Sequence, residues 1–387
     1  MKNNSTLKYD VNRIIGSVDS ENPKATIIVF AGIHGNENAG VKASENILKR
    51  INDEKINFKG NIFFIYGNIN ALNKGIRFED IDLNRIWCKE RISKLKTKTN
   101  GHFIEDFEQA SIYLQIKNIL ENYKGPFYFF DLHTTSSHTI PFITISDSLN
   151  NRNFSSKFPV PIVLGIEEFL QGPLLTYMNE FGHIALGFEA GQHIDKRSVK
   201  NCEAFIWMSL VFTKCIEEKQ LPDFFKHKQT LRRCKCGHNF YEIDYQYIIK
   251  EVEDFKMNLG FENFEKIKKH QDLAISNNTR VKAPIGGRIF MPLYQMQGND
   301  GFFIVNRISL FWLKTSRMAR KLHTHHFLRL LPGIQSDPGN NYTLIVDPKT
   351  AKFLTKEIFH LFGYRQQVLK DDKLHFIKRD RRITMFE

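Results

Sequence analysis

Two short motifs carry the residue types that could bind a catalytic metal ion. GIHGNE (residues 32–37) places His34 and Glu37 three positions apart, and FFDLHTT (residues 129–135) supplies His133 about a hundred residues later. Two imidazoles and one carboxylate are a ligand set that catalytic zinc sites use, with a fourth position left open for water. The sequence therefore predicts a zinc site of this composition.

Both motifs directly follow apolar runs of β-strand character, TIIVFAG (26–32) and PFYFFDL (126–132). Ligands placed there would lie at the carboxyl ends of strands, where open α/β sheets form their binding sites. Asp131, two positions before His133, would share one face of its strand with that imidazole. Asp131 is therefore a candidate to orient the His133 imidazole by hydrogen bonding to it, without binding the metal itself.

Three further segments carry polar residues that suit amide hydrolysis. GIR ends in Arg77, IDLNR contains Asn84 and Arg85, and GFEAG places Glu189 at the end of another apolar run. A guanidinium can stabilise a tetrahedral oxyanion, and an Arg beside an amide donor suits a free carboxylate. A carboxylate near the attacking water can take its proton and later pass it to the leaving amine.

Taken together and in this order, GIHGNE, the two arginines with DLNR, DLHTT and GFEAG resemble the succinylglutamate desuccinylase/aspartoacylase family, which is related to the zinc carboxypeptidases. The resemblance covers about residues 24–310 and is strongest over 24–220. It implies a zinc hydrolase that removes an acyl group from an amino-acid nitrogen.

The resemblance also implies a role for each motif residue. One Zn²⁺ per chain would be bound by His34, Glu37 and His133. Carbonyl polarisation would fall to Arg77 and acid/base catalysis to Glu189. The substrate α-carboxylate would be held by Asn84 and Arg85.

One position departs from the aspartoacylase pattern. Aspartoacylases have an Arg ten residues before the catalytic Glu, which holds the side-chain carboxylate of the substrate, whereas this chain has Asn179. Asn179 offers a neutral amide where the aspartoacylases have a positively charged guanidinium. Burying a substrate carboxylate without a cation beside it is unfavourable. We therefore expect a substrate with one carboxylate rather than acetylaspartate, unless Lys196 or Arg197 reaches the site.

Other potential ligands have a structural interpretation. His138 and His193 lie near the motifs but match no required role, and HTHH (323–326) has the character of a solvated polar stretch. CKCGH (234–238) could hold a second metal ion through two cysteines and a histidine. Because no second pair accompanies it, a structural zinc there is the less favoured interpretation.

The order of apolar runs predicts the fold. Strand-like segments alternate with helical patterns at 38–51 and 105–123, which predicts a mixed or parallel α/β sheet covered by helices. The resemblance implies a zinc carboxypeptidase-like version of that sheet, in a catalytic domain over residues 1–222. The predicted strands are 26–31, 61–66, 127–132, 140–145, 161–165 and 184–189.

Two smaller parts are expected to follow. Residues 223–310 contain short apolar runs separated by Pro and Gly turns, which predicts a β-rich domain that covers the pocket. Its AP-x-x-GRI segment resembles the barrel of biotinyl and lipoyl carriers, but no Lys occupies the expected hairpin tip. Residues 311–387 are predicted to form a basic extension with helices, LTKEIFHLFGY among them.

Composition limits the classes of partner. Of the net charge of +13, the segment 314–387 supplies +8, from 15 Lys/Arg against 7 Asp/Glu. No nucleic-acid-binding motif accompanies this charge, so nucleic acid is not an expected partner. Five scattered cysteines, no signal-peptide pattern and no run of 18 apolar residues favour a cytoplasmic protein without a membrane span.

The predicted function is a zinc-dependent amidohydrolase acting on a small N-acyl amino acid. The nearest alternative is a metallocarboxypeptidase, which could use the same ligands and arginines but needs an open pocket for a peptide chain. A third possibility is an inactive binding protein of the same fold, which the presence of Glu189 and all three ligands argues against. The acyl group and the oligomeric state stay open.

Overall fold

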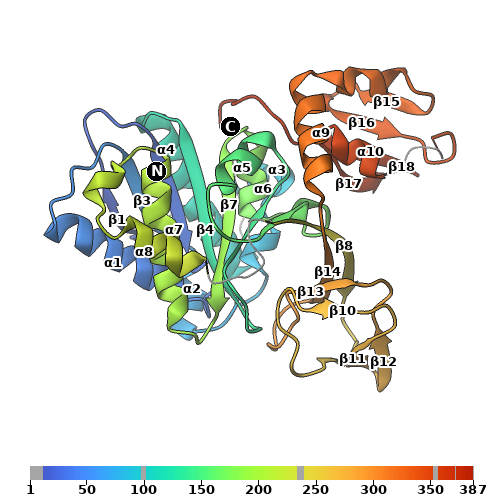
Figure 1. The fold of residues 1–387 in the computed structure, drawn as a ribbon, viewed down its shortest axis with the longest axis horizontal. Helices are drawn as coiled ribbons and strands as arrows, with labels where there is room; N and C mark the ends of the chain where they lie inside the picture. Colours follow the sequence, from blue (N-terminus) through green and yellow to red (C-terminus); the bar gives the residue numbers. More distant parts are fainter. Residues whose placement is uncertain (1–11, 97–101, 233–238, 352–355, 371, 387) are drawn as a thin grey trace, which may run out of the picture.

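The computed structural model describes residues 12–96, 102–232, 239–351, 356–370 and 372–386. Figure 1 shows three parts in chain order: a sheet flanked by helices, a smaller part of short strands, and a C-terminal part with its own sheet. Within these ranges, no helix is both long enough and apolar enough to cross a membrane.

The largest sheet has 11 strands, and the first seven in spatial order build the N-terminal part. These strands are β1 (Ile14–Val18), β3 (Asn61–Tyr66), β2 (Thr26–Ala31), β4 (Phe127–Thr135), β7 (Ile184–Gln192), β5 (Phe142–Ile145) and β6 (Ile162–Leu164). Strands β3, β2, β4 and β7 run parallel, whereas β1 and β5 pair antiparallel with β3 and β7. The predicted mixed α/β sheet is confirmed.

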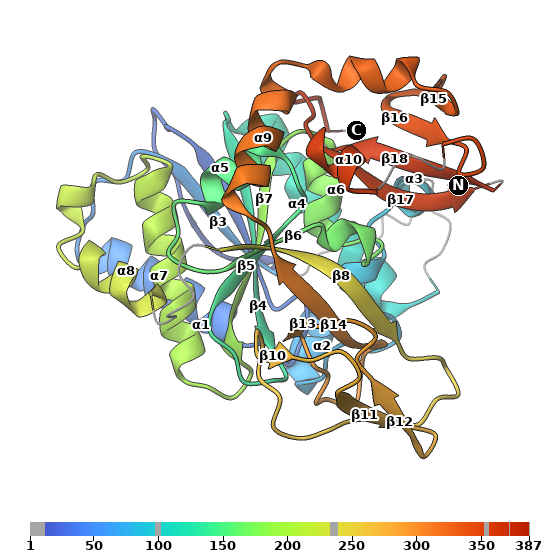
Figure 2. The same cartoon turned by 45° about the vertical axis from the view of Figure 1, so that its right-hand side comes forward.

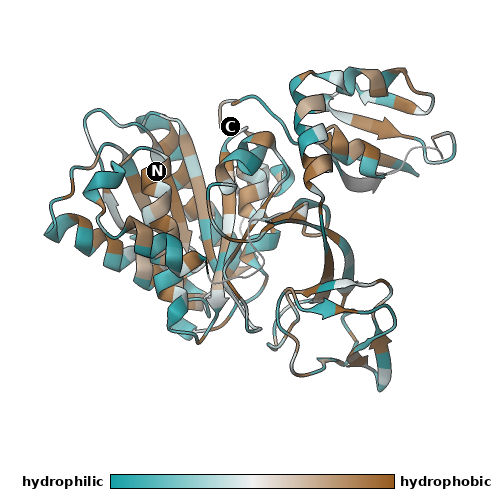
Figure 3. Cartoon of the chain, in the orientation of Figure 1, coloured by the Kyte–Doolittle hydropathy of each residue, from teal (hydrophilic) through white to brown (hydrophobic). Residues whose placement is uncertain are grey.

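The central strands bury both faces because apolar residues occupy successive positions. On β2, Ile27 and Val29 face one hydrophobic cluster, while Ile28 and Phe30 face another. The first cluster is covered by α1 (Ala39–Asp53), α5 (Leu149–Ser155), α7 (Arg197–Phe212) and α8 (Phe224–Leu231). The second is covered by α3 (Lys89–Lys96), α4 (Ile104–Asn122) and α6 (Leu174–Glu180). Figure 3 shows the apolar strands enclosed by helices with polar outer faces.

The β-rich part extends the same sheet with β8 (Phe240–Ile248), β14 (Asp300–Arg307), β13 (Gly287–Phe290) and β10 (Lys266–Ile267). The connection is direct, because β8 pairs in parallel with β6, with Ile162 opposite Phe240. A separate sheet of β12 (Thr279–Lys282), β11 (Asp272–Ser276) and β9 (Phe255–Met257) lies at the far ends of β8 and β14 (Figure 2). The predicted β-rich character is confirmed, while the domain boundary at residue 222 stays a prediction.

The C-terminal part combines helices with a sheet that the sequence analysis did not anticipate. Helices α9 (Leu310–Lys321) and α10 (Lys356–Leu361) pack near an antiparallel sheet of β15 (Ile334–Asp337), β16 (Asn340–Val346), β18 (Lys373–Lys378) and β17 (Tyr364–Lys370). Its core includes Leu344, Phe359 and Phe376. The turn sequence DPGN between β15 and β16 was the available signal for a hairpin.

Buried ion pairs attach the C-terminal part to the N-terminal part. The fully buried carboxylate of Asp147 accepts hydrogen bonds from Arg152 at 2.8 Å, Arg320 at 2.9 Å and Arg365 at 2.6 Å. Although burial opposes it, these three guanidiniums hold the pKa of Asp147 well below its ordinary value. Two of the three arginines come from the C-terminal part.

Arg365 also fills a second cluster of potential metal ligands. Glu168, Glu242 and His360 lie at ligand spacing. The Nη1 of Arg365 lies 2.5 Å from Glu242 and 3.4 Å from Glu168, and a guanidinium there takes the place of a cation. This cluster is therefore part of the attachment between the two parts.

The chain end returns to the N-terminal part. The backbone N–H of Thr384 donates to the carbonyl of Phe181 at 3.1 Å. The ring of Phe386 packs against Tyr113, Tyr177 and Phe181. The last residues thus join the hydrophobic cluster beneath α4 and α6 instead of forming a free basic tail.

Candidate active site

The structure brings the three predicted metal ligands together at the carboxyl ends of β2 and β4. Glu37 lies between the two imidazoles: its Oε1 is 2.9 Å from His34 Nδ1, and its Oε2 is 3.0 Å from His133 Nδ1. Ligand atoms of all three lie within 4.8 Å of one another, and all three residues are buried. Two nitrogens and a carboxylate therefore converge on one point.

Glycines allow the loop between β2 and α1 to turn sharply. Gly32 has φ of +74°, a left-handed conformation that favours glycine. A Cβ on Gly35 would lie 2.0 Å from the carbonyl carbon of Ala71 in α2 (Ile69–Lys74), so no side chain fits there. The backbone N–H of Gly35 also donates to the carbonyl of Arg77 at 3.1 Å. This close packing fixes the direction of the two ligands on the loop.

Each imidazole has a second carboxylate behind it. His133 Nε2 lies 2.7 Å from Asp131 Oδ2, the residue predicted to orient this ligand. His34 Nε2 lies 3.1 Å from Asp82 Oδ1. A carboxylate only accepts, so it favours a proton on Nε2 and leaves the Nδ1 lone pair for a cation. Asp82 lies inside the IDLNR motif, but no role was predicted for it from the sequence.

The buried charges around the imidazoles call for a further cation. Glu37, Asp82 and Asp131 contribute three carboxylates and Arg77 one guanidinium, a net charge of −2 when both imidazoles are neutral. Although burial opposes both shifts, the imidazoles hold the pKa of Glu37 well below its ordinary value, and Asp131 raises the pKa of His133 well above its own. The donor set and its charge therefore fit a divalent metal ion.

Arg77 lies beside the ligands and is paired with carboxylates of the protein. Its Nη2 donates to Asp82 Oδ2 at 2.9 Å, and its Nη1 lies 3.7 Å from Glu37 Oε1. Its backbone N–H donates to Gln297 of the β-rich part at 3.1 Å. The guanidinium lines the site cavity, so its position is compatible with the predicted polarisation of a substrate carbonyl.

Glu189 lies opposite His133 on the neighbouring strand β7. Its carboxyl is buried, and within the described part of the chain its Oε2 has no hydrogen-bond partner. Burial raises the pKa of this carboxyl to about 8, against the opposing charge of His133. A carboxyl whose pKa lies near neutrality can both accept and release a proton, which suits the predicted acid/base role.

Asn84 is oriented by the first residue of α6. Its Oδ1 accepts a hydrogen bond from the backbone N–H of Leu174 at 3.0 Å, while its Nδ2 lies 3.5 Å from His133 Nε2. The carboxylate of Asp82 begins this turn by accepting from the backbone N–H of Asn84 at 2.9 Å. The short helix η1 (Leu83–Arg85) thereby presents the amide to the cavity.

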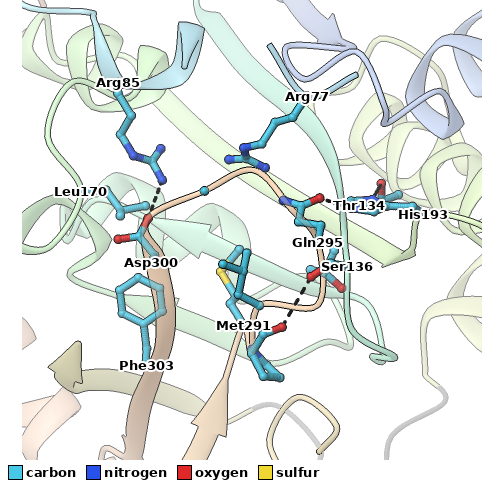
Figure 4. A pocket seen from close by; sticks show the side chains of 14 residues that line it. Arg77, Arg85, Thr134, Ser136, Leu170, His193, Met291, Gln295, Asp300 and Phe303 are labelled. Carbon is cyan, nitrogen blue, oxygen red and sulfur yellow. Dashed lines mark hydrogen bonds and ion pairs between the residues drawn. The ribbon is translucent and has the colours of Figure 1, made fainter. Parts of the chain in front are cut away.

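Arg85, the second predicted substrate-binding residue, is paired with a residue that the sequence analysis missed. Its Nη2 donates to Asp300 Oδ2 at 3.0 Å (Figure 4). Gln246 donates to the other oxygen, Asp300 Oδ1, at 2.6 Å. Asp300 begins β14 of the β-rich part, more than two hundred positions along the chain. The guanidinium predicted to bind the substrate carboxylate therefore already forms an ion pair with a carboxylate of the protein.

The site is a small chamber covered by the β-rich part. Two adjoining cavities of about 70 and 90 Å³ share Arg77, Arg85, Thr134, Leu170 and Met291. Beyond the metal ligands and Glu189, hydroxyl and aliphatic side chains wall the deeper cavity: Thr144, Ile145, Ser146, Leu175 and Thr176. Figure 4 shows that residues of the β-rich part, among them Met291, Gln295 and Asp300, line the cavity opposite Arg77 and Arg85.

His193 takes part in this cover, although it has no assigned role in the sequence analysis. Its Nδ1 lies 2.7 Å from Thr134 Oγ1, and its Nε2 lies 3.1 Å from Gln295 Oε1. It therefore links the end of β4 to the β-rich part. His138, in contrast, is exposed and pairs with Glu262 at 3.2 Å, in agreement with a structural interpretation.

Asn179 does not face the site, which corrects the argument built on that position. Its Nδ2 donates to the carbonyl of His183 at 3.1 Å, and its side chain lines a different cavity. Lys196 and Arg197 do not line the site cavities either, and Arg197 pairs with Asp195 at 2.7 Å. None of these three residues therefore determines which charged groups the deeper cavity accepts.

Two further segments of the sequence, HTHH and CKCGH, contain histidine. HTHH was expected to be solvated, but His325 is buried in η4 (Thr324–Leu330), where Lys378 Nζ lies 2.8 Å from its Nε2. That expectation was wrong for this residue because the unanticipated C-terminal sheet packs against it. The candidate structural zinc segment CKCGH lies outside the described residues.

Comparison with known proteins agrees with this site. Residues 23–204 match the family model of the succinylglutamate desuccinylase/aspartoacylase catalytic domain. Succinylglutamate desuccinylase of Pseudomonas putida GB-1 is 36% identical over 69 residues, which span 18% of this chain and only 21% of that relative. The desuccinylase of Pseudoalteromonas atlantica is 23% identical over 282 residues, 67% of this chain and 75% of its own length.

A solved structure supports the same fold over a longer stretch. The succinylglutamate desuccinylase of Vibrio parahaemolyticus superposes with a TM-score of 0.53 at 18% identity, covering 76% of this chain and 86% of that one. The predicted resemblance is thereby confirmed. Over residues 23–204, the chain is similar to the catalytic domain of the succinylglutamate desuccinylase/aspartoacylase family.

Proposed function

We propose that this protein is a zinc-dependent hydrolase that removes a small, uncharged acyl group from an N-acyl amino acid with one carboxylate. The proposal rests mainly on the position of Glu189 on β7 directly opposite His133 on β4. His133, with its fellow ligands, supplies a metal-binding set, and Glu189 directly opposite supplies a buried carboxyl with a free oxygen.

The residues divide the chemistry of amide hydrolysis among them. When bound by the three ligands, zinc lowers the pKa of water and polarises a carbonyl. Glu189 would accept a proton from the attacking water and return it to the leaving amine nitrogen. Arg77 would donate to the oxygen that becomes negative as the carbonyl carbon turns tetrahedral. Asn84 Nδ2 and Arg85 would hold the carboxylate of the amino acid.

The proposed size and charge of the acyl group rest on the deeper cavity. Its volume is about 90 Å³, and its only Lys or Arg side chains are Arg77 and Arg85. Both are already paired, with Asp82 and Asp300. A second substrate carboxylate would therefore be buried without a cation, which is unfavourable. Acetyl and propionyl groups fit these walls better than succinyl.

Two alternatives are less well supported. A metallocarboxypeptidase needs room for a peptide chain, but the adjoining cavity, which Met291, Gln295 and Asp300 line, has a volume of only about 70 Å³. An inactive binding protein would not need a buried carboxyl beside the metal ligands. Glu189 is present there, and no described residue forms a hydrogen bond with its Oε2.

Release of free amine from a panel of N-acyl amino acids, measured with zinc-loaded protein, tests the proposal. We expect turnover of N-acetyl derivatives of neutral amino acids, lower efficiency on acetylaspartate and N-succinylglutamate, and loss of turnover after chelation that added zinc restores. Preference for either dianionic substrate would overturn the argument from the neutral walls. Cleavage of short unblocked peptides alone would favour the carboxypeptidase.

A further inference from the structure

A second cavity lies between the N-terminal and C-terminal parts, away from the metal ligands. Its volume is about 470 Å³, several times that of the site chamber. The N-terminal part contributes the start of α5 and the end of α6, including Asn150, Asn179 and Gly182. The C-terminal part contributes α9, η4, Tyr342 and the segment from Lys378 onward. The volume is within the range of small-molecule sites, roughly 300–1,000 Å³.

Cations far outnumber acids among the charged residues that line this cavity. Six Lys or Arg residues and three His residues line it, against one acidic residue, Asp380. That carboxylate is already engaged, because it accepts from the backbone N–H of Leu149 at 2.7 Å and lies 3.6 Å from Arg320 Nη1. The lining cations are Arg320, Lys321, Lys378, Arg379, Arg381 and Arg382, and the imidazoles are His323, His325 and His326.

Several of these cations lack a carboxylate partner. Among the described residues, no ion pair of 4 Å or less joins Lys378, Arg381 or Arg382 to an acidic side chain. Lys378 Nζ instead lies 2.8 Å from His325 Nε2, a neutral acceptor at most. Arg379 is 2% exposed, and its Nε lies 3.4 Å from Glu167 Oε1. Its Nη2, however, has no hydrogen-bond partner in the part of the chain that the structure describes. Buried donors without partners are costly and uncommon in folded proteins.

The protonation of the pair Lys378 and His325 follows from their burial. Burial, followed by the charge of Lys378, lowers the pKa of His325 to about 4, so this imidazole is neutral at physiological pH. Burial also lowers the pKa of Lys378, against the charge of Asp380. Burial is the larger cause of both shifts, and neighbouring cations add to it: Lys378 acts on His325, and Arg320 acts on Lys378. An anion in the cavity would offset the repulsion between these cations.

The cavity also offers flat surfaces beside the cations. The guanidinium of Arg381 lies over the ring of Tyr342, 5.1 Å from its centroid. The imidazoles of His325 and His326 lie 4.2 Å apart. Cations with neighbouring rings suit a ligand that combines phosphate groups with a planar or polar body.

We propose that this interdomain cavity binds a small phosphate-bearing polyanion, with Lys378, Arg379 and Arg381 as its principal phosphate ligands. A concave cavity of this size favours a compact di- or triphosphate over a nucleic acid or a membrane surface, which would need an extended basic face. The site is distinct from the hydrolytic chamber and does not depend on the metal or on the proposed reaction.

Titration calorimetry of the full-length protein with inorganic triphosphate and with ATP tests the proposal. We expect saturable binding at micromolar concentrations, weakened about ten-fold or more in Lys378→Gln and in Arg381→Gln and restored largely in Lys378→Arg. Lys349→Gln is the matched control, because it removes one exposed charge from the same part of the chain without lining the cavity. Circular dichroism of each variant checks that the fold is kept.

Three results would overturn the proposal. One is an absence of binding up to about 1 mM of either ligand. Another is an equal loss of affinity in Lys349→Gln, which would indicate only general attraction to a basic protein. The third is binding of anionic phospholipid vesicles or of RNA that triphosphate fails to displace. Binding of triphosphate as tight as that of ATP would support the site and assign recognition to the phosphates alone.

Discussion

Arg85 and Asp300 form a 3.0 Å ion pair between the catalytic sheet and the β-rich part, at the mouth of the candidate active site. The guanidinium proposed to hold a substrate carboxylate therefore has a carboxylate of the protein as its partner. A substrate must either replace Asp300 or share Arg85 with it, so the pair sets the affinity of the site for anions.

Changing Asp300 to Asn should free the charge of Arg85 for substrate. We expect KM for N-acetyl neutral amino acids to fall several-fold, because the unpaired Arg85 binds the substrate carboxylate more tightly. The value of kcat should change by less than about two-fold, because bound substrate and transition state gain the same interaction. Steady-state kinetics check this. Asp254→Asn, which removes an exposed acid from the same part, is the control for net charge. A rise in KM would mean that Asp300 positions Arg85 instead of competing with substrate.

Metal content should depend on the carboxylates behind the imidazoles as well as on the ligands. His133→Ala should lose nearly all bound zinc, and Asp82→Asn should weaken zinc about 10–100-fold, because Asp82 orients His34. Metal analysis after equilibration with a zinc buffer measures both. His138→Ala, an exposed histidine outside the site, should bind zinc normally. A zinc content of one per chain in His133→Ala would mean that the metal binds elsewhere.

Glu189→Gln should separate chemistry from binding. Because an acid/base group contributes about 10²–10⁴-fold, kcat should fall by at least the lower figure, while zinc content stays at one per chain. The amide keeps the size of the side chain, so circular dichroism and melting temperature should change little. Turnover within a few-fold of the unaltered protein would remove Glu189 from the mechanism.

Acid should weaken the attachment of the C-terminal part. Although burial opposes it, His360 and Arg365 lower the pKa of Glu168 to about 2, and the arginines around Asp147 lower its pKa well below the ordinary value. A carboxyl whose pKa is lower in the folded state than in the unfolded state stabilises the folded protein. This stabilisation is complete above the unfolded-state pKa, near pH 4, and is lost as the pH falls through the folded-state pKa. Urea unfolding should therefore show stability declining between about pH 4.5 and 2.

Arg365→Gln is the companion variant for the acid experiment. Removing one partner of a buried ion pair typically costs about 3–5 kcal/mol at neutral pH. The variant should also show a shallower acid dependence, since Glu168 and Glu242 lose the cation that favours their ionised forms. Arg329→Gln is the control, an exposed change in the same part. An acid profile parallel to that of the unaltered protein would exclude these carboxyls as the cause.

The sequence could predict the features whose signals are local. Apolar runs predicted β2 to β7, although not β1. His34, Glu37, His133 and Asp131 were found because each lies in or shortly after one of these runs. Asp82 was missed because its role depends on the short helix η1, which turns its carboxylate toward His34.

Other features depend on pairings that no local pattern encodes. Asp300 lies far along the chain, and nothing around it identifies Arg85 as its partner. The C-terminal sheet was missed because polar and charged residues interrupt the apolar runs of β15, β17 and β18. Asn179 was misplaced because counting positions along a sequence does not show on which side of α6 a side chain lies.

The hydrogen-bonded continuity of the 11-stranded sheet constrains how substrate enters. Because β8 pairs with β6, and β14 with β8, the β-rich part cannot swing away from the catalytic strands as a hinged lid without breaking the ladder. The segment between β13 and β14, which carries Gln295 and Gln297, has no strand pairing of its own. Entry and product release should therefore proceed by movement of this one loop, and a disulfide or proline that stiffens it would slow turnover without touching the chemistry.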